Sequence, residues 1–511
     1  MPEHYRALFF ILALATAVFA FAKGPITAVA MSTEDFTRRR NAWYAITIIG
    51  FLSPHFWVFV AIVSVFLYFA AKHEHNPVAL FFFVFLALPQ ILVRIPGFAG
   101  IESFVAIDYV RILTVFVLLP ACVKLRKEAQ GQPGGWGATD ILLTLYVGLT
   151  LVLQALDNSL TGSVRNLIYV FVDILIPYYA VSRALKNLKI FRETVASLVV
   201  AIMVLSLIGL FELVRSWLPY TSLQAAWGVD WDLGGYLARG GLLRASATTG
   251  QAIALGYVIA IGLGFYLYLR KSITHWAAWG VGLALLMAGE IAPLSKGPWL
   301  GVVAMVFVFV ASGPKRWSAA GKISLLMPFV VLFMISTEMG QQMTSFLPFV
   351  GKLDESSQDY RTRLFDTAIE IILNNPFLGS HDYLLYMENM RQGQGIIDLV
   401  NTFLIVALNT GLIGLALFCG VFSMTLIGIF RLMRRLPNDS ELHVLGRSLL
   451  AVLIGILLII TTVSPIAQIP LLYWMVAAMG VAYYTKMTNM TTDTQQTTST
   501  GKTARAWIRN Q

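Results

Sequence analysis

Long apolar stretches, each about as long as a membrane is thick, alternate along the chain with short polar connections. Because about 20 apolar residues cross the hydrocarbon core of a bilayer, these stretches predict an all-α polytopic membrane protein with about 14 (about 12–14) transmembrane helices. The stretch 42–53 is apolar but too short to cross alone. The predicted spans are 5–22, 54–71, 77–94, 105–123, 140–157, 166–182, 194–214, 250–269, 276–292, 298–313, 323–337, 399–430, 445–464 and 467–485.

The composition supports this interpretation. Of the 511 residues, 57% are hydrophobic and only 13% are charged, whereas soluble domains carry nearer a quarter charged residues. The net charge of +10 is typical of a polytopic protein that holds Lys and Arg in cytoplasmic loops, so we expect no nucleic-acid partner. The first apolar stretch reaches Lys23 without a small-residue cleavage site, and we interpret it as a span rather than a removed signal peptide.

Basic residues between the spans predict the orientation of the chain. With both termini in the cytoplasm, the main clusters all lie on the cytoplasmic side. One group, residues 38–40, is then placed outside; either the first hairpin is miscounted or these arginines have another role there. The main clusters are Lys124, Arg126 and Lys127; Arg183, Lys186, Lys189 and Arg192; Arg270 and Lys271; Lys315 and Arg316; and Arg431, Arg434 and Arg435.

Two segments on the outer side, 215–249 and 338–398, are longer than a turn. Long connections are uncommon unless they are functional. The second segment predicts a helix, with a capping signal at 356–359 and an end at the Asn-Asn-Pro of 374–376. Its apolar face contains Leu364, Phe365, Ala368, Ile369 and Ile372 at helical spacing.

The outer stretch WGVDWDLGGYLARGGLLRASATTGQ, residues 227–251, combines aromatic and charged side chains. Flat aromatic faces beside polar groups suit sugar rings, although Trp and Tyr are also favoured at membrane surfaces. The candidate glycan-binding residues here are Trp227, Trp231, Asp232, Tyr236 and Arg239.

Arg244 lies at the start of a predicted span and is followed by small residues. An arginine at this depth is costly unless it meets an anion or a cavity, and its planar fork matches phosphate oxygens. A second cluster has a break at Pro293 and Gly297 that presents Ser295 and Lys296. Broken helices at membrane depth usually line a cavity, and the alternative is a simple hairpin turn.

A third cluster surrounds the start of the span at 399–430. Asp398 and Asn401 are three residues apart and share a helix face. His381 is a candidate base near neutral pH, with plain surface exposure as the alternative. Arg363 and Arg391 are candidates for phosphate or sugar contacts. The sequence has no nucleotide-binding loop and no metal-ligand spacing, so we expect no metal and no cofactor.

At these residues the chain resembles the O-antigen ligase and polymerase superfamily, from about residue 200 to 480. The resemblance is carried by RTRLFDTAIEIILNNPFLGS (361–380) and GQGIIDLVNTFLIVALNTGLIGLALF (393–418). RGGLLRASATTGQAIALGY (239–257) is similar to the family's arginine-bearing start of a span. LSKGPWLG (294–301) resembles its Ser-Arg-Gly-x-Trp-Leu-Gly break, with lysine in place of arginine.

The resemblance implies a glycosyltransferase-C-like fold and transfer of glycan from undecaprenyl diphosphate at the periplasmic face, without metal. Family arginines that bind the diphosphate correspond to Arg244 and Arg363, and less directly to Lys296. Ligases have a histidine base where this chain has Val400. This departure counts against a ligase, and it leaves Asp398 as the first candidate base and His381 as the second.

We therefore predict three regions: N-terminal transmembrane helices at 1–198, a ligase/polymerase-like core at 199–485 with the periplasmic loop 338–398, and a disordered cytoplasmic tail at 486–511. The predicted function is an inner-membrane glycan polymerase for exopolysaccharide or O-antigen. The alternatives are an O-antigen ligase acting on lipid A–core, or a flippase for lipid-linked glycan. The expected partners are the undecaprenyl-diphosphate-linked oligosaccharide, membrane lipid and other polysaccharide-assembly proteins.

Overall fold

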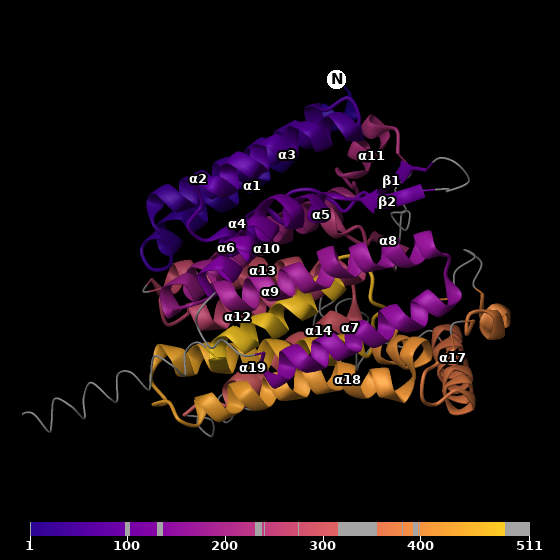
Figure 1. The fold of residues 1–511 in the computed structure, drawn as a ribbon. Helices are drawn as coiled ribbons and strands as arrows, with labels where there is room; N and C mark the ends of the chain where they lie inside the picture. The colour runs from indigo at the N-terminus through magenta and orange to yellow at the C-terminus, as the bar shows by residue number, and fades with distance from the viewer. Residues whose placement is uncertain are drawn as a thin grey trace, which may run out of the picture.

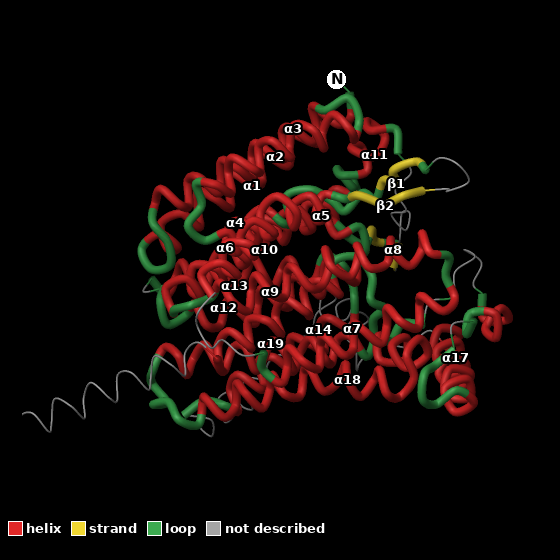
Figure 2. The backbone as a smooth tube through the Cα atoms, viewed as in Figure 1, coloured by secondary structure: helices red, strands yellow, loops and turns green. Residues whose placement is uncertain are grey.

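The protein is a bundle of long helices that run roughly side by side, with a small β-hairpin at one end (Figures 1 and 2). The computed structural model describes residues 2–97, 103–129, 136–229, 238–239, 241–273, 275–314, 355–380, 382–391, 397 and 399–485, with only the backbone given at 355–359 and 361. The described part is mostly helical and confirms the predicted all-α class.

The N-terminal part contains ten α-helices, two π-helical turns and the hairpin β1–β2. Its elements are α1 (Glu3–Thr27), α2 (Thr33–Leu52), α3 (Phe56–Lys72), α4 (Pro77–Val84), β1 (Val93–Pro96), β2 (Ser103–Ile107), α5 (Tyr109–Leu113), η1 (Thr114–Leu118), α6 (Leu119–Ala129), α7 (Ala138–Asp157), α8 (Leu160–Val170), η2 (Phe171–Leu175), α9 (Ile176–Ala184) and α10 (Leu188–Arg215).

The first two long helices of the C-terminal part pack against α10. Its elements are α11 (Thr221–Trp227), the hairpin β3 (Ala238–Arg239) and β4 (Leu242–Leu243), η3 (Ala247–Thr249), α12 (Ala252–Leu269), α13 (Trp276–Ile291), α14 (Lys296–Ala311), α17 (Glu355–Asn374), η4 (Leu385–Met390), α18 (Thr402–Met433), α19 (Glu441–Ile460) and a last helix, Ile469–Thr485.

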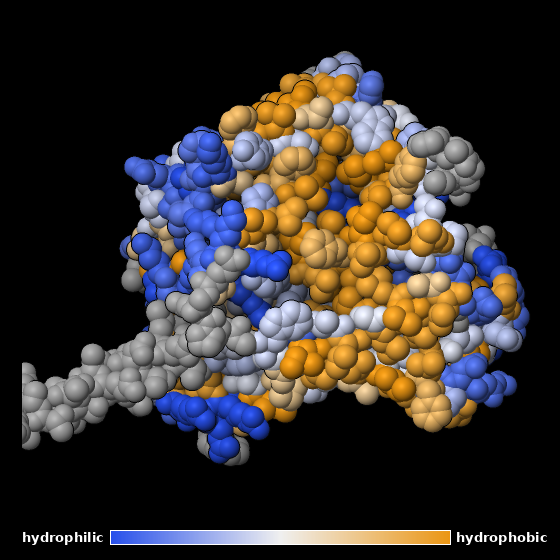
Figure 3. Space-filling view, viewed as in Figure 1, coloured by the Kyte–Doolittle hydropathy of each residue, from blue (hydrophilic) through white to orange (hydrophobic). Residues whose placement is uncertain are grey.

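The bundle has a hydrophobic middle and two hydrophilic ends (Figure 3). Among the described residues, 7 helices are long and apolar enough to cross a membrane, and apolar helices of 10–17 residues accompany them at 56–72, 276–291, 296–311 and 469–485. Several apolar helices of this kind indicate a multi-pass membrane protein.

The basic clusters within the described residues gather at one end of the bundle, which we call the basic end, while Lys315 and Arg316 lie outside the described part. Lys186 pairs with Glu128 at the end of α6, and Arg192 pairs with Glu441 at the start of α19. The opposite end, which we call the far end, contains the hairpin β1–β2, the ends of α10 and α13, and α17 (Figure 1).

Residues 38–40 lie at the basic end, because Arg39 pairs with Glu193 beside Arg192. The Trp217 indole donates to Glu3, so the N-terminal end of α1 lies at the far end. The prediction that the N-terminus lies on the side of the basic clusters is therefore wrong. The error comes from the stretch 42–53, which is too short to cross alone. It is part of the 20-residue helix α2, which begins after the capping residue Ser32 and includes Arg39, whose charge is neutralised by carboxylates.

The predicted span 77–94 is also wrong. Helix α4 has 8 residues, and the chain then turns through Pro89 into strand β1. Proline lacks the amide hydrogen that would continue a helix, and it disfavours helical geometry in the residue before it. The resulting β1–β2 hairpin brings Arg94 opposite Ala106 at the far end.

Candidate functional site

The far end brings together the three clusters that the sequence places far apart, and the loop 461–468 connects them. The Gln468 amide donates to the Thr248 carbonyl at 3.4 Å. The Thr402 hydroxyl donates to the Val463 carbonyl at 2.7 Å. A Cβ atom on Gly297 would lie only 2.5 Å from the Thr462 hydroxyl, so α14 also begins in close contact with this loop.

Two arginines of the segment after α11 reach the break between α13 and α14. Arg244 donates from Nε to the Pro293 carbonyl at 3.1 Å and from Nη2 to the Ser295 hydroxyl at 3.2 Å. Arg239 donates to the Leu294 carbonyl at 2.7 Å. The break is therefore no simple hairpin turn, since it holds two guanidinium groups in one place.

The only hydrogen-bond acceptors found for Arg244 among the described residues are neutral. Burial, and then the charge of Arg239, lowers the pKa of Arg244 to about 10. The guanidinium is still charged at neutral pH, so a bound anion would stabilise it.

Helix α10 holds the Arg244 segment in place. The buried Glu212 carboxylate accepts hydrogen bonds from the backbone amides of Ser246 (2.9 Å) and Ala247 (2.8 Å). This contact draws the chain into a turn in which Ala247 has a φ of 45°. A non-glycine residue in the left-handed region is strained and persists only where surrounding contacts enforce it.

Similar strain occurs at three other positions of the far-end loops. Leu294, Val400 and Ala467 have φ values of 49°, 42° and 48°. They lie in the α13–α14 break, before α18 and in the loop 461–468. Strained residues of this kind cluster at ligand-binding and catalytic sites, so their distribution supports this end as the functional one.

Lys296 and Asn401 both lie at helix starts of this region. Lys296 is the first residue of α14 and is partly buried. The Asn401 side-chain oxygen caps α18 by accepting from the amides of Phe403 and Leu404, at 2.9 and 3.2 Å. Its capping role occupies that oxygen, and a glycan contact by Asn401 remains a prediction.

The predicted helix of the outer segment is confirmed as α17. Leu364, Ala368 and Ile372 are buried against α18, while Phe365 and Ile369 are more exposed. Three of the five residues of the predicted apolar face therefore pack. Arg363 is exposed on this helix.

The Asn-Pro-Phe-Leu-Gly turn after α17 docks into a kink of α18. The Ser380 amide donates to the Leu408 carbonyl, and the Leu412 amide donates to the Pro376 carbonyl, both at 2.7 Å. Gly411 has a φ of 66°, and a Cβ atom there would lie 2.2 Å from the Phe377 carbonyl oxygen. Glycine is required because the two backbones touch.

Two predicted ligand residues have structural partners instead. Trp227 is 4% exposed, donates to the Gly50 carbonyl at 3.1 Å and stacks on Phe59. Its ring has no face open to a sugar, so the glycan-binding prediction for Trp227 fails on packing grounds. Arg391 is exposed and pairs with Glu388 three residues before it.

Several predicted site residues lie outside the described part of the chain. They are the candidate bases Asp398 and His381 and the candidate glycan-binding residues Trp231, Asp232 and Tyr236.

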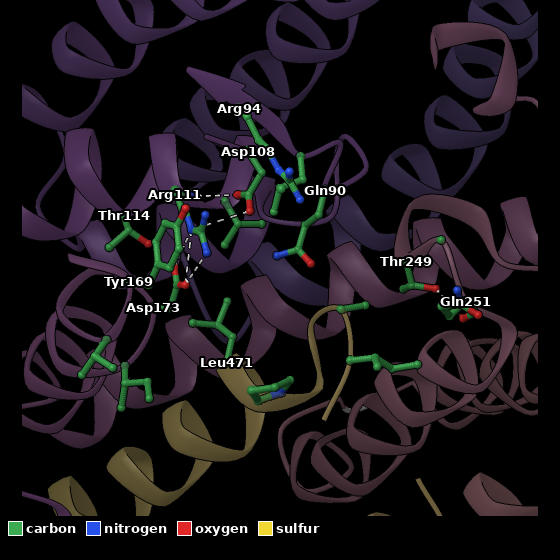
Figure 4. A pocket seen from close by; sticks show the side chains of 18 residues that line it. Gln90, Arg94, Asp108, Arg111, Thr114, Tyr169, Asp173, Thr249, Gln251 and Leu471 are labelled. Atoms are coloured by element: carbon green, nitrogen blue, oxygen red, sulfur yellow. Dashed lines mark hydrogen bonds and ion pairs between the residues drawn. The ribbon is translucent and has the colours of Figure 1, made fainter. Parts of the chain in front are cut away.

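The far end also contains a cavity of about 870 Å³ that the sequence analysis missed (Figure 4). Arg94, Arg111 and Asp173 line one side, and Thr249 and Gln251 line another. Arg94 and Arg111 fall inside predicted spans, and a charged residue within an apolar span is the signal that could have revealed them.

The comparison with protein families agrees with this geometry. Residues 281–419 match the family model described as O-antigen ligase. The match begins in α13, includes the break that holds Arg244, and extends to the kinked helix α18. No curated protein matches the chain. Over residues 281–419, the chain is therefore similar to the O-antigen ligase family, in agreement with the predicted resemblance to the O-antigen ligase/polymerase superfamily.

Proposed function

We propose that this protein is a glycan polymerase of the bacterial inner membrane that works at the periplasmic face. It transfers undecaprenyl-diphosphate-linked glycan to an acceptor repeat unit in O-antigen or exopolysaccharide biosynthesis. The match to the O-antigen ligase family supports activity of the ligase/polymerase type in general. Polymerase activity, the lipid carrier and the periplasmic location are the parts that we propose.

The observation that carries the proposal is the environment of Arg244. It is held in a strained turn, packed against a helix break, and hydrogen-bonded only to neutral oxygens among the described residues. A diphosphate would supply the missing negative charge, and the guanidinium fork would bind two of its oxygens.

The proposed reaction needs stabilisation of a leaving group. The acceptor hydroxyl attacks the anomeric carbon of the donor glycan, a new glycosidic bond forms, and the bond from that carbon to the diphosphate breaks. Negative charge develops on the departing lipid diphosphate, where Arg244 and Arg363 are the proposed stabilising groups. The hydroxyl proton passes to a base, for which Asp398 is our first proposal and His381 our second.

Val400 favours a polymerase over a ligase. Its apolar side chain occupies the position at which ligases, by the resemblance, have a catalytic histidine. The Val400 backbone adopts a φ of 42° and its amide donates to Ser464 at 3.1 Å. The position is therefore held by the backbone and has no titratable side chain.

The test uses a strain that lacks the native protein, complemented with wild type, Arg244→Ala, Arg363→Ala and Asp398→Asn. Surface and lipid-linked glycans are then compared on gels. A polymerase predicts loss of long polymer, with single repeats on lipid A or on the carrier. Polymer accumulating on the carrier beside bare lipid A–core would mean a ligase. Repeats trapped on the inner leaflet would mean a flippase, and the enzyme proposal would fall.

A further inference from the structure

We propose that the cavity beside strand β1 binds the phosphorylated headgroup of a second membrane-embedded lipid, the lipid-linked acceptor of the transfer. This inference rests on the proposed function, because glycan transfer between two lipid-linked substrates requires two anion-binding sites. The Arg244 site would hold the donor diphosphate, and the cavity would hold the acceptor.

The cavity has a framework that is rigid before any ligand binds. Arg111 forms a two-point ion pair with Asp173, with nitrogen–oxygen distances of 3.0 and 2.8 Å, and donates to the Ala106 carbonyl at 2.6 Å. It also stacks over Tyr169 at 4.0 Å. These contacts tie β2, α5, α8 and η2 into one wall (Figure 4).

Arg94 differs from Arg111 in having no ion pair. Its side chain is exposed to the cavity, and it has no hydrogen bond or ion pair within the described residues. Nearby Asp108 caps α5 and lies 3.9 Å from Arg111, while Asp173 is taken by Arg111. The two carboxylates are thus committed to Arg111, and within the described residues the positive charge of Arg94 has no counter-charge.

A neighbouring hollow of about 430 Å³ shares Arg94, Arg111 and Tyr169 with this cavity and adds Arg165. Arg165 donates to the backbone carbonyl of Phe104 at 2.8 Å. The positive charge therefore continues toward the hairpin β1–β2, beyond the first cavity. This arrangement suits an extended anionic headgroup better than a single small anion.

The cavity is bordered by exposed apolar residues. Leu92 and Ile466 line it and are 47% and 37% exposed, and Phe171 in the neighbouring π-helical turn is 49% exposed. Figure 3 shows hydrophilic residues recessed among hydrophobic ones in this part of the surface. Such a site would take a phosphate inside while an attached lipid chain stays against the apolar face.

The cavity and the Arg244 site share two walls. The segment that carries Arg244 continues into Thr249, Gly250 and Gln251, which line the cavity. Ala467 also lines the cavity, in the same loop that contacts the starts of α14 and α18. Two headgroups bound in this way would be separated only by the Arg244 segment and the loop 461–468, which contain the strained residues Ala247 and Ala467.

The experiment measures binding of farnesyl diphosphate to the purified full-length protein in detergent by calorimetry. Wild type should bind two equivalents, and Arg94→Ala should lose one of them through an affinity loss of about 10- to 100-fold at that site. Arg94→Lys should restore part of the affinity. Arg215→Ala, which removes an exposed far-end arginine outside the cavity, is the matched control and should keep both.

Two further arms separate the possible failures. If Arg94→Ala retains both equivalents, the second site is refuted, while loss of one equivalent in Arg244→Ala would leave the donor site standing. If Arg244→Ala loses none, the proposed function is the part that fails. Farnesyl diphosphate should bind more tightly than inorganic diphosphate. Equal affinity would refute a lipid ligand at this cavity.

Discussion

Arg39 at the basic end and Arg244 at the far end are both removed from open water, but their partners differ. Arg39 is 0% exposed and contacts Glu74 at 2.8 Å and Glu193 at 2.5 Å. Arg244 contacts a backbone carbonyl and a serine hydroxyl, and the positive charge of Arg239 adds to burial in lowering its pKa. Within the described part of the chain, carboxylates neutralise Arg39 but none pairs with Arg244.

The difference separates a structural role from a binding role. A buried charge is tolerated when the protein supplies its counter-charge, as Glu74 and Glu193 do for Arg39. A charge held among neutral groups instead stores an unfavourable energy that a bound anion would relieve. The pairing of each arginine, and not its burial alone, is therefore our reason for proposing that Arg244 binds a ligand and Arg39 does not.

The largest expected effect is on folding. Arg39→Ala should lower the free energy of unfolding by about 3–5 kcal/mol, because the buried carboxylates of Glu74 and Glu193 lose the fully buried guanidinium that lies between them. Thermal unfolding in detergent and the yield of folded protein measure this. Arg40→Ala, next to it on a more exposed face, is the control. An unchanged melting temperature for Arg39→Ala would show that the network is not structural.

Arg244→Ala should show the opposite behaviour. We expect about a 100-fold or greater loss of glycan transfer, because the developing diphosphate charge loses its partner, with little loss of stability. Arg244→Lys should recover part of the activity. Transfer measured with purified protein and lipid-linked substrate tests this, and a loss that tracks unfolding would remove the contrast with Arg39.

Gly411→Ala tests whether α17 must dock on α18 to complete the far end. The added Cβ atom would meet the Phe377 carbonyl at a left-handed backbone position, so we expect a destabilisation of about 1–3 kcal/mol. Hydrogen exchange should show α17 opening before the rest of the bundle. Gly148→Ala in α7, where a Cβ atom meets nothing within 4 Å, is the control.

The pKa of Arg244 predicts a pH dependence. Because that pKa is lowered to about 10, the cation is present below this pH and is lost as the pH rises through it. Binding of inorganic diphosphate by Arg94→Ala, which keeps only the Arg244 site, should weaken by up to about tenfold per pH unit above that value. Calorimetry across this range measures it, and a flat profile would show that Arg244 does not bind the anion.

The smallest effect is expected at Arg391. Its exposed ion pair with Glu388 resembles surface pairs that contribute little, so Arg391→Ala should change transfer by less than about fivefold. The same glycan transfer assay measures it. A loss as large as that of Arg244→Ala would move Arg391 into the binding site and weaken the rule that a paired arginine is structural.

The sequence by itself determined the class of the protein and most of its helices. Hydrophobic length requires helices that cross a membrane, and the spacing of Leu364, Ala368 and Ile372 correctly predicted α17. It also singled out Arg244, because an arginine at the start of an apolar span is expensive. These are local properties of the chain, which do not depend on what packs against it.

Only the tertiary structure decided which charges are neutralised. Arg39 meets Glu193 across 154 positions of sequence, and this pairing lets α2 become a full helix and reverses the predicted side of the N-terminus. The packing of the helices also places Trp227 in the core and Arg94 in the wall of a cavity. Hydropathy is a property of single residues, whereas the cost of a buried charge depends on its partners, which the fold alone brings together.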